Sequence, residues 1–307
     1  MSLPSDRFTG VLAAALTPQT ADGTPDEKLM TEHCNWLLAN GCDGLAILGT
    51  TGEANSFGLK ERIRIIEGLV EAGIPGETLM PGTGSCAITD AVALTRVAVN
   101  AGARGVLMLP PFYYKNPSDE GLFAHFSEVI QQVADDRLKI YLYHFPQMSA
   151  TPISYNLIEM LLKAYPDTLA GMKDSSGVLD NMVGAAKNFP GFCVLAGADD
   201  LLLQLLEQGG GGCITACANV ASSLAGEVYR GFHAGEDVSA ANATLTKVRK
   251  VVSSFPPGAP ALKTLMARHS GNDSWLNMRP PLQKLSGEKA DELFAAFDAL
   301  DYQMPTI

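Results

Sequence analysis

The sequence predicts an α/β fold, a closed (β/α)8 TIM barrel followed by a C-terminal helical segment. From Phe8 onwards, short apolar runs alternate with longer amphipathic stretches, and eight such units precede residue 235. The units recur at intervals of roughly twenty to thirty-five residues without a break in composition, and their span fits the usual ~250 residues of a closed parallel barrel. We therefore expect a catalytic barrel at 1–235 and a helical segment at 236–307 packed on it.

Each unit begins with an apolar run of strand length that is bounded by glycine, proline or polar residues. The predicted strands are residues 10–16, 44–48, 78–81, 105–109, 139–143, 169–172, 192–195 and 213–215. The stretches between them have helical spacing, and several end at a glycine, as at Gly41 and Gly73. The predicted helices are residues 25–40, 59–72, 88–100, 118–134, 154–165, 179–188, 199–208 and 220–233, with 238–252, 260–269 and 289–301 in the C-terminal segment.

A doubly wound open sheet is the main alternative to the barrel. That fold usually has fewer repeats or a glycine fingerprint for phosphate directly after its first strand. The segment Leu16-Thr17-Pro18-Gln19 carries no such glycines, so the barrel is the better prediction.

Composition excludes several classes of partner. The formal net charge of -11 argues against nucleic acid or anionic lipid. No apolar run reaches the ~18 residues of a membrane span, and the first residues lack the pattern of a secretory signal. Six scattered cysteines suit a reduced, cytoplasmic protein, and Cys213 and Cys217 lack a second ligand pair for a metal. We therefore expect a cytoplasmic protein that binds no metal.

Reactive groups of such a barrel lie at the C-terminal ends of its strands. Polar side chains that follow predicted strands there are Thr50, Thr51, Tyr113, Tyr114, Tyr143, His144, Lys173, Ser175, Asp199 and Asp200. The glycine run 209–212 precedes the eighth strand, so we expect it on the opposite face as a tight turn. Gly82-Thr83-Gly84 follows the third strand but is too short to indicate a phosphate site.

Lys173 ends the apolar strand 169–172, and Tyr143 ends the strand before it. Neighbouring strands lie only ~4.8 Å apart, so the two side chains can meet. An apolar setting favours a neutral, nucleophilic amine, tyrosine can carry protons, and threonine hydroxyls with backbone amides can hold a carboxylate. This set suits Schiff-base chemistry on a 2-oxo acid. The alternative is an ordinary surface lysine at a strand end.

Five motifs follow one another along nearly the whole chain. They are Gly49-Thr50-Thr51-Gly52-Glu53, Tyr113-Tyr114-x-x-Pro117-Ser118-x-Glu120-Gly121, Tyr143-x-x-Pro146, Gly171-x-Lys173-Asp174 and Gly209-Gly210-x-Gly212-x-Ile214. Together they resemble the dihydrodipicolinate synthase and N-acetylneuraminate lyase family of pyruvate-dependent class I aldolases on (β/α)8 barrels. The resemblance implies a lyase that needs no cofactor beyond a covalent Schiff base with its substrate, and a homotetramer built as a dimer of dimers.

The resemblance also implies a role for individual residues. Lys173 would form the Schiff base with pyruvate or another 2-oxo acid, and Tyr143 would be the general acid and base. Thr50 would link Tyr143 to Tyr114 in a proton relay, with Tyr114 reaching into the neighbouring subunit's site. Further substrate contacts are implied for Thr50 and Thr51 at the carboxylate and for the backbones of Gly197 and Ile214.

Departures from the family pattern bear on the substrate. The synthases follow their tyrosine with Asn-x-Pro-x-Arg, whose arginine holds the carboxylate of aspartate semialdehyde, but here Met148 takes that place. Asp199 and Ser175 resemble groups with which the lyases bind sugar hydroxyls. Asp199 and Asp200 could equally mark a helix N-terminus, where acidic side chains are favourable. His144 is expected to be a substrate-side polar residue or a packed imidazole.

We therefore expect reversible cleavage of a 2-keto-3-deoxy sugar acid or a related 4-hydroxy-2-oxo acid to pyruvate and an aldehyde. The alternative within the family is 4-hydroxy-tetrahydrodipicolinate synthase, which acts in lysine biosynthesis. An alternative of another class is a non-catalytic sensor that binds a 2-oxo acid.

Overall fold

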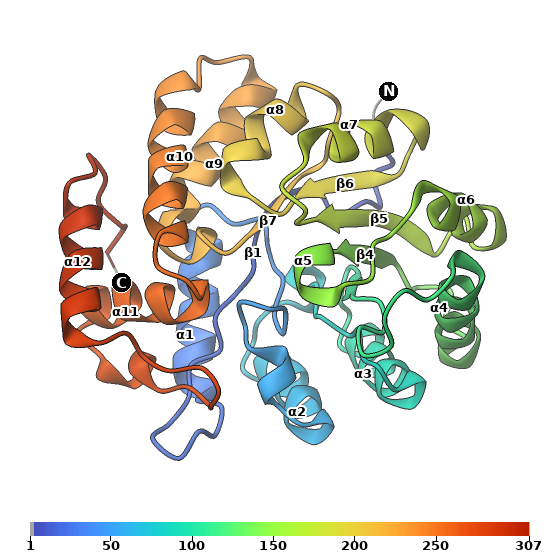
Figure 1. Ribbon diagram of the computed structural model, residues 1–307, viewed down its shortest axis with the longest axis horizontal. Coiled ribbons are helices and arrows are strands. Elements are labelled where there is room, and N and C mark those ends of the chain that lie inside the picture. The colour runs from blue at the N-terminus through green and yellow to red at the C-terminus, as the bar shows by residue number, and fades with distance from the viewer. Residues whose placement is uncertain (1–2, 307) are drawn as a thin grey trace.

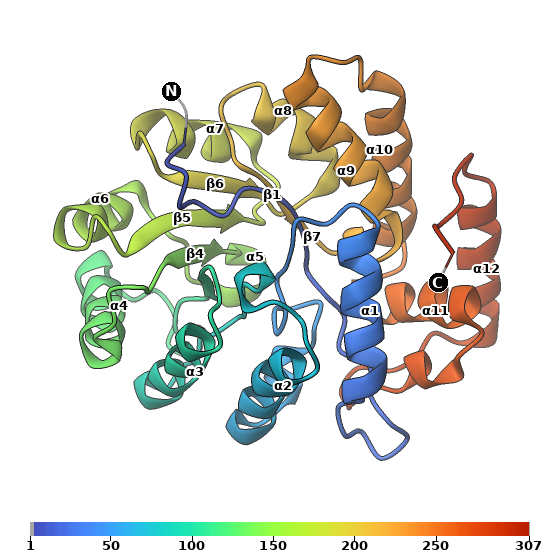
Figure 2. The ribbon, with the colours of Figure 1, turned by 180° about the vertical axis from the view of Figure 1, so that it is seen from behind.

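The computed structural model describes residues 3–306. Seven parallel strands form one curled sheet in the order β2-β1-β7-β6-β5-β4-β3. Figures 1 and 2 show these strands at the centre of the molecule, with helices around the outside. The strands are β1 (Gly10–Ala13), β2 (Gly44–Leu45), β3 (Val106–Met108), β4 (Ile140–His144), β5 (Leu169–Asp174), β6 (Cys193–Ala196) and β7 (Gly212–Thr215).

An eighth segment, residues 79–82, closes the gap between β2 and β3. Leu79 bridges to Leu45 of β2, and Gly82 bridges to Leu107 of β3, both in parallel. The prediction of a third strand at 78–81 is therefore wrong at its first residue, because Gly76–Thr78 forms a turn of 3-10 helix. Pro81 lacks an N–H for the ladder, although its carbonyl accepts from Leu107 N at 2.9 Å. The segment makes isolated bridges in place of a regular strand and still completes a closed barrel.

The predicted second strand, 44–48, is also too long. The regular strand ends at Leu45, although Ala46 O and Ile47 O still accept the backbone N–H groups of Ala15 and Gly82, and Leu48 adopts the left-handed backbone region with a φ of 55°. That conformation is uncommon for a residue with a Cβ and turns the chain out of the strand. The turn carries the chain directly into residues 49–53.

The helices of the barrel follow the predicted order closely, and Ile88–Asn100 has the predicted bounds. Those up to the last strand are α1 (Glu27–Ala39), α2 (Leu59–Glu71), α3 (Ile88–Asn100), α4 (Asp119–Val133), α6 (Tyr155–Ala164), α7 (Leu179–Asn188) and α8 (Leu202–Leu206). Three short additions, η1 (Ala54–Ser56), η2 (Gly76–Thr78) and α5 (Pro146–Ser149), were not predicted. The predicted helix 199–208 is divided into η3 (Asp199–Leu201) and α8.

Side chains on the strands alternate between the barrel interior and the helix layer. The interior cluster comprises Phe8, Leu12, Ala14, Ala46, Met80, Leu107, Tyr141, Tyr143, Ala170, Cys193, Leu195 and Ile214. Outward-facing neighbours such as Val11, Ala13 and Cys213 join the larger core beneath the helices. The lumen is therefore filled by side chains, and the chemistry must take place at an end of the barrel.

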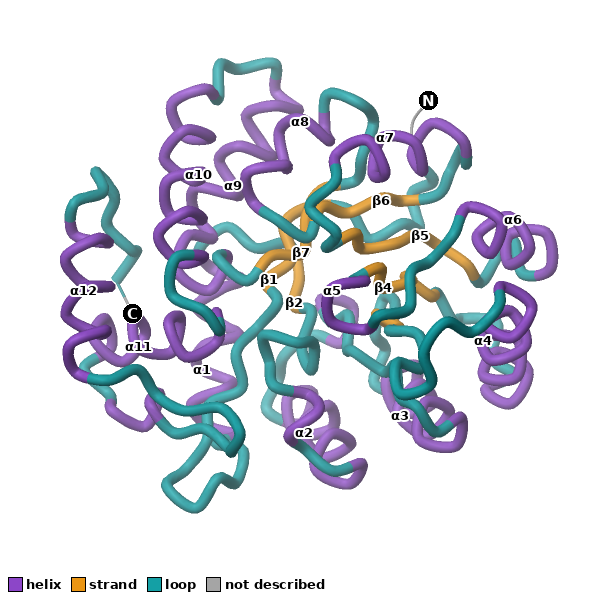
Figure 3. The backbone as a smooth tube through the Cα atoms, in the orientation of Figure 1, coloured by secondary structure: helices purple, strands orange, loops and turns teal. Residues whose placement is uncertain are grey.

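The C-terminal segment packs on one side of the barrel, beside α1 and α9 (Ala218–Ala234), as Figures 1 and 3 show. It contains α10 (Ser239–Ser253), α11 (Gly258–Ser270), η4 (Asp273–Leu276) and α12 (Gly287–Asp298). Arg279 ties it to the barrel, because its guanidinium bonds both carboxylate oxygens of Glu61 on α2. Within residues 3–306, no helix is long and apolar enough to cross a membrane.

Candidate active site

Lys173 and Tyr143 lie side by side on neighbouring strands. Tyr143 of β4 is in register with Lys173 of β5, and Lys173 Nζ lies 3.4 Å from the Tyr143 hydroxyl and 4.5 Å from the ring centroid. Only 5% of Lys173 and 4% of Tyr143 is exposed. The predicted neighbourhood of these two residues is therefore present, and the alternative of a surface lysine is wrong.

The turn at residues 49–52 brings a third polar group to the same point. Thr50 Oγ1 lies 3.4 Å from the Tyr143 hydroxyl, and Thr50 itself is exposed. The turn sits tightly on the end of β1, since a Cβ at Gly52 would meet the carbonyl oxygen of Ala15 at 2.8 Å. The Thr17 hydroxyl donates to Gly52 O at 2.8 Å. Tyr143 is thus linked through Thr50 to the open end of the barrel, and Thr51 is half-buried beside it.

The walls beside Lys173 are apolar. Leu195 of β6 is in register with Lys173, and Leu195 and Ile214 both belong to the interior cluster. Phe145, two residues after Tyr143, stacks on the Tyr143 ring with centroids 5.7 Å apart. The amine therefore lies among apolar side chains with little contact to solvent, and Ile214 belongs to the same interior cluster.

Ser175 and Gly197 meet at the ends of β5 and β6. Gly197 N donates to Asp174 O at 2.8 Å, and a side chain at Gly197 would collide with Ser175. Glycine is required there because the two strand ends approach so closely. Both residues are half-buried, so they form part of the mouth above the interior cluster.

His144 faces away from this group. Its side chain lies on the opposite face of β4 from Tyr143, where Nδ1 accepts the backbone N–H of Ile153 at 3.0 Å. Burial lowers the pKa of His144, and the nearby Asp174 carboxylate opposes that shift. The imidazole is therefore packed and holds the chain after α5, which is the second of the two expectations for this residue.

Asp199 is also apart from Lys173. It is fully buried, and its Oδ1 accepts the hydroxyl of Thr215, which lies on the helix-facing side of β7. Burial raises the pKa of Asp199, while Arg249 of α10 acts in the opposite direction. The structure does not bring Asp199 to the group around Lys173, and this acid serves the packing between β7 and α10.

Tyr113 and Tyr114 project from the loop after β3. They are 72% and 76% exposed and pack edge-to-face on each other, with centroids 5.3 Å apart. No hydrogen bond joins Thr50 to Tyr114 within the described residues of this single chain. Two adjacent exposed tyrosines are unusual on a free surface, and the expected contact of Tyr114 with a second subunit stays a prediction.

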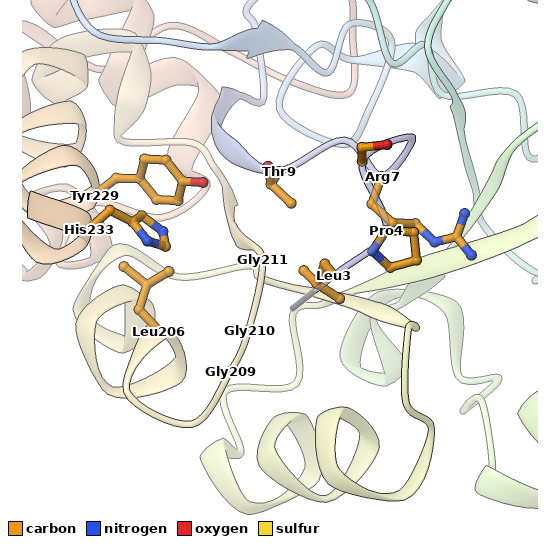
Figure 4. A pocket seen from close by; sticks show the side chains of 11 residues that line it. Leu3, Pro4, Arg7, Thr9, Leu206, Gly209, Gly210, Gly211, Tyr229 and His233 are labelled. Atoms are coloured by element: carbon orange, nitrogen blue, oxygen red, sulfur yellow. The ribbon is translucent and has the colours of Figure 1, made fainter. Parts of the chain in front are cut away.

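The glycine run lies at the other end of the barrel, as predicted. Gly209, Gly210 and Gly211 line a cavity of about 350 Å³ together with Arg7 and Tyr229, and Figure 4 shows this arrangement. The amides of all three glycines donate to backbone carbonyls of Leu206, Leu205 and Val194. These glycines therefore form a turn, and their amides are not available to hold a phosphate.

Met148 lies on the short helix α5 at the active end and is 60% exposed. The preceding Gln147 donates to Ser176 O at 2.7 Å, which fixes α5 against the end of β5. Met148, where the resemblance led us to expect an arginine in the synthases, is therefore a solvent-accessible and uncharged side chain. Its correspondence to that arginine stays a prediction.

Residues 7–300 match the sequence model of the dihydrodipicolinate synthetase family. The chain belongs to this family. An uncharacterized DapA-like lyase of Chloroflexus aurantiacus is 35% identical to it over 292 residues, which is 95% of this chain and 96% of the relative. A 4-hydroxy-tetrahydrodipicolinate synthase of Agrobacterium fabrum is 35% identical over 233 residues, or 75% of this chain and 76% of that protein.

Solved structures of the family share the fold. The dihydrodipicolinate synthase of Agrobacterium tumefaciens superposes with a TM-score of 0.87 at 33% identity, covering 96% of this chain and 100% of the other. YagE, a prophage protein of the family from E. coli K12 solved in complex with pyruvate, gives a TM-score of 0.85 at 25% identity and coverages of 95% and 98%. The predicted family, barrel fold and enzyme class are confirmed, and the names of the relatives include both a synthase and an uncharacterized lyase.

Two features of the site were missed in the sequence. Phe145 could have been found, because a residue two positions after an inward-facing tyrosine on a strand faces inward as well. Lys263 of α11 is fully buried and forms an ion pair with Glu53, directly after the turn at 49–52. The sequence shows Lys263 as a single charged residue within the largely apolar run from Ala259 to Ala267. No local pattern identifies Glu53 as the partner of this lysine.

Proposed function

We propose that this enzyme is a Schiff-base-forming class I aldolase that reversibly cleaves a 2-keto-3-deoxy sugar acid or a related 4-hydroxy-2-oxo acid to pyruvate and an aldehyde. The observation that carries the proposal is the Tyr143 hydroxyl, which lies 3.4 Å from both Lys173 Nζ and Thr50 Oγ1 at the mouth of an apolar barrel. A relative of the same fold solved in complex with pyruvate supports a 2-oxo acid as substrate.

In the cleavage direction, the Lys173 amine adds to the C2 carbonyl of the 2-oxo acid. Tyr143 gives a proton to the resulting hydroxyl, which leaves as water, and an iminium forms. The Tyr143 phenolate then takes the proton of the 4-hydroxyl group, the C3–C4 bond breaks, and its electron pair moves into the iminium to give an enamine. The aldehyde departs, the enamine takes a proton at C3, and water hydrolyses the iminium to release pyruvate and the free amine.

The remaining assignments follow from this scheme. Thr50 and Thr51, with the amides of their turn, hold the carboxylate of the 2-oxo acid, and the backbones of Gly197 and Ile214 line the opposite wall. Because the iminium itself accepts the electron pair, the reaction needs no further cofactor. Ser175, at the half-buried mouth, is assigned to the hydroxyls of the aldehyde portion.

We also infer a tight dimer, paired into a homotetramer, in a cytoplasmic setting. The exposed pair of Tyr113 and Tyr114 supports a subunit contact at the active end, with Tyr114 reaching Thr50 of the neighbouring subunit. The acidic charge and the scattered cysteines support the cytoplasmic location.

4-Hydroxy-tetrahydrodipicolinate synthase is the second candidate, and the names of several relatives favour it. Met148 disfavours it, because an exposed thioether cannot replace the bidentate contacts of a guanidinium with the carboxylate of aspartate semialdehyde. A sensor that binds a 2-oxo acid without turnover is the third candidate.

Borohydride trapping separates these candidates. Wild-type protein incubated with pyruvate and borohydride should gain one covalent adduct, and Lys173→Ala should gain none. A wild-type protein without an adduct would overturn the Schiff-base proposal. A panel of 4-hydroxy-2-oxo acids assayed for pyruvate release, beside a coupled assay with aspartate semialdehyde, then distinguishes lyase from synthase. Trapping without turnover on any substrate would indicate the sensor.

A further inference from the structure

A closed ring of polar groups, three of them buried and Asn277 half-buried, lies directly behind the turn at 49–52. The Glu53 side chain is fully buried, and its carboxylate forms an ion pair with Lys263 of α11 and accepts from Gln19 Nε2 at 3.0 Å. Lys263 Nζ also donates to Asn277 O at 3.0 Å. Asn277 Nδ2 donates in turn to Gln19 O at 2.9 Å, which closes the ring.

The ring joins the barrel to the C-terminal segment. Gln19 lies after β1 and Glu53 after β2, whereas Lys263 is on α11 and Asn277 follows η4. Lys263 is the one ring member that brings a positive charge, and neither its side chain nor that of Glu53 is exposed. Burial lowers the pKa of Lys263, and the Glu53 carboxylate opposes that shift.

Burying an ion pair is energetically unfavourable, because both charged groups lose their hydration. Apolar side chains of the same volume usually pack at least as well, whereas removing one charge leaves the other unpaired in a medium of low polarity. In some proteins such a pair fixes the relative position of the groups that it joins. Here the pair joins α11 to the residue that follows the turn at 49–52.

The backbone of Glu53 has a conformation that its surroundings must stabilise. Glu53 and Leu48 both adopt the left-handed region, with φ of 56° and 55°, and they flank the turn on either side. A residue with a Cβ is strained there and stays there only when its surroundings hold it. Glu53 N donates to Thr50 O at 3.1 Å, so the side chain that anchors Glu53 also sets the place of Thr50.

We propose that Glu53 and Lys263 are positioning residues for the carboxylate seat, the carboxylate-binding turn that contains Thr50 and Thr51. The C-terminal segment then contributes to substrate binding through Lys263. This inference rests on the proposed function, because it assumes that the turn binds the carboxylate of a 2-oxo acid. Neither residue touches substrate. Their effect passes through the left-handed turn at Glu53 to the Thr50 hydroxyl and the amides beside it.

The test compares Lys263→Met with the double variant Glu53→Gln/Lys263→Met. The double variant leaves no charge buried in the ring, so it can fold even where Lys263→Met cannot. The matched control is Arg268→Met, on the same helix α11, because Arg268 pairs with Asp298 of α12 and makes no contact with the turn. Circular dichroism and thermal melting verify that each variant is folded.

The readout is the pyruvate concentration that gives half-maximal borohydride trapping. We expect it to rise at least about tenfold in both ring variants, by analogy with the loss of affinity when groups that orient the ligands of a metal site are removed. The yield of trapping at saturating pyruvate should stay close to that of wild type, because Lys173 is untouched. Arg268→Met should keep the wild-type pyruvate dependence.

A folded Lys263→Met or double variant that is trapped with the wild-type pyruvate dependence overturns the inference. A loss of trapping at saturating pyruvate in a folded variant also overturns it, because the ring would then act on the lysine and not on the carboxylate seat. Failure of the proposed function is seen separately, as absence of an adduct on wild-type protein itself.

Discussion

Lys173 Nζ lies above the face of the Tyr143 ring, 4.5 Å from its centroid, and 3.4 Å from the hydroxyl of the same ring. The aromatic face stabilises a cationic nitrogen, and the hydroxyl can give or take the protons that turn a carbinolamine into an iminium. One side chain thus stabilises the positive nitrogen and serves as the acid and base beside it.

Replacing Lys173 by alanine should abolish turnover. Without the amine no iminium can form, and we expect aldol cleavage to fall by at least ~10³-fold. The fold should persist, because removing a buried amine also removes its desolvation cost. Pyruvate release and thermal melting measure the two effects. A folded Lys173→Ala enzyme with substantial turnover would contradict the mechanism.

Tyr143→Phe should separate chemistry from stability when compared with Tyr141→Phe. Loss of the Tyr143 hydroxyl removes the acid and base, so kcat should fall by about 10²- to 10⁴-fold with little change in melting temperature. Tyr141, two residues earlier on β4, also faces the interior, but its hydroxyl oxygen accepts the buried N–H of Phe8 at 2.6 Å. Tyr141→Phe should therefore cost roughly 1–3 kcal/mol of stability and leave kcat nearly intact. The opposite pattern in the two variants would show that the roles are misassigned.

Introducing arginine at Met148 should improve the use of an aldehyde that carries a carboxylate. The position is 60% exposed, so the change should alter the melting temperature little. We expect activity with aspartate semialdehyde to rise about tenfold, because a guanidinium can bind the carboxylate in a bidentate manner. Val178, which is 52% exposed after β5, gives the matched control Val178→Arg. Equal gains in both variants would indicate a general charge effect.

The stability of the protein should fall as the pH drops below about 6.5, in part because of His33. Burial lowers the pKa of His33 to about 4, so this imidazole is neutral in the folded state and takes up a proton more readily when the chain unfolds. The contribution is fully present above the unfolded value of about 6.5 and is lost as the pH falls towards 4. Denaturant titrations at pH 7 and pH 5 should show the loss, and His33→Leu should flatten it. An unchanged pH dependence in His33→Leu would remove this residue as the cause.

Much of the fold could be predicted because each barrel unit is local. The spacing of apolar residues and the glycines that follow the helices are visible in short windows, and Lys173 and Tyr143 fall on adjacent strands by chain order alone. The third strand was misplaced because its ladder is irregular around Pro81, and only its two neighbours show that the segment closes the barrel.

Site residues were predicted less completely, for two different reasons. For His144 and Asp199 the sequence left two roles open, contact with substrate or a role in packing and at a helix N-terminus, because a position after a strand does not say which face a side chain occupies; His144 follows the inward-facing Tyr143, and Asp199 begins η3. The alternation along β4 could have decided between the two roles of His144. The pairing of Glu53 with Lys263 could not be predicted, because the two residues are far apart in the chain and no local pattern joins them.

That separation has a consequence for the order in which the protein is made. The strands and helices of the barrel leave the ribosome before α11 does, since synthesis proceeds from the N-terminus and domains generally fold as they emerge. Lys173, Tyr143 and Thr50 can therefore assemble while Glu53 still lacks its counter-charge. On the proposal above, a nascent chain would contain the lysine nucleophile before the turn at 49–52 could bind a carboxylate tightly. Full activity would then begin only when α11 has packed on the barrel.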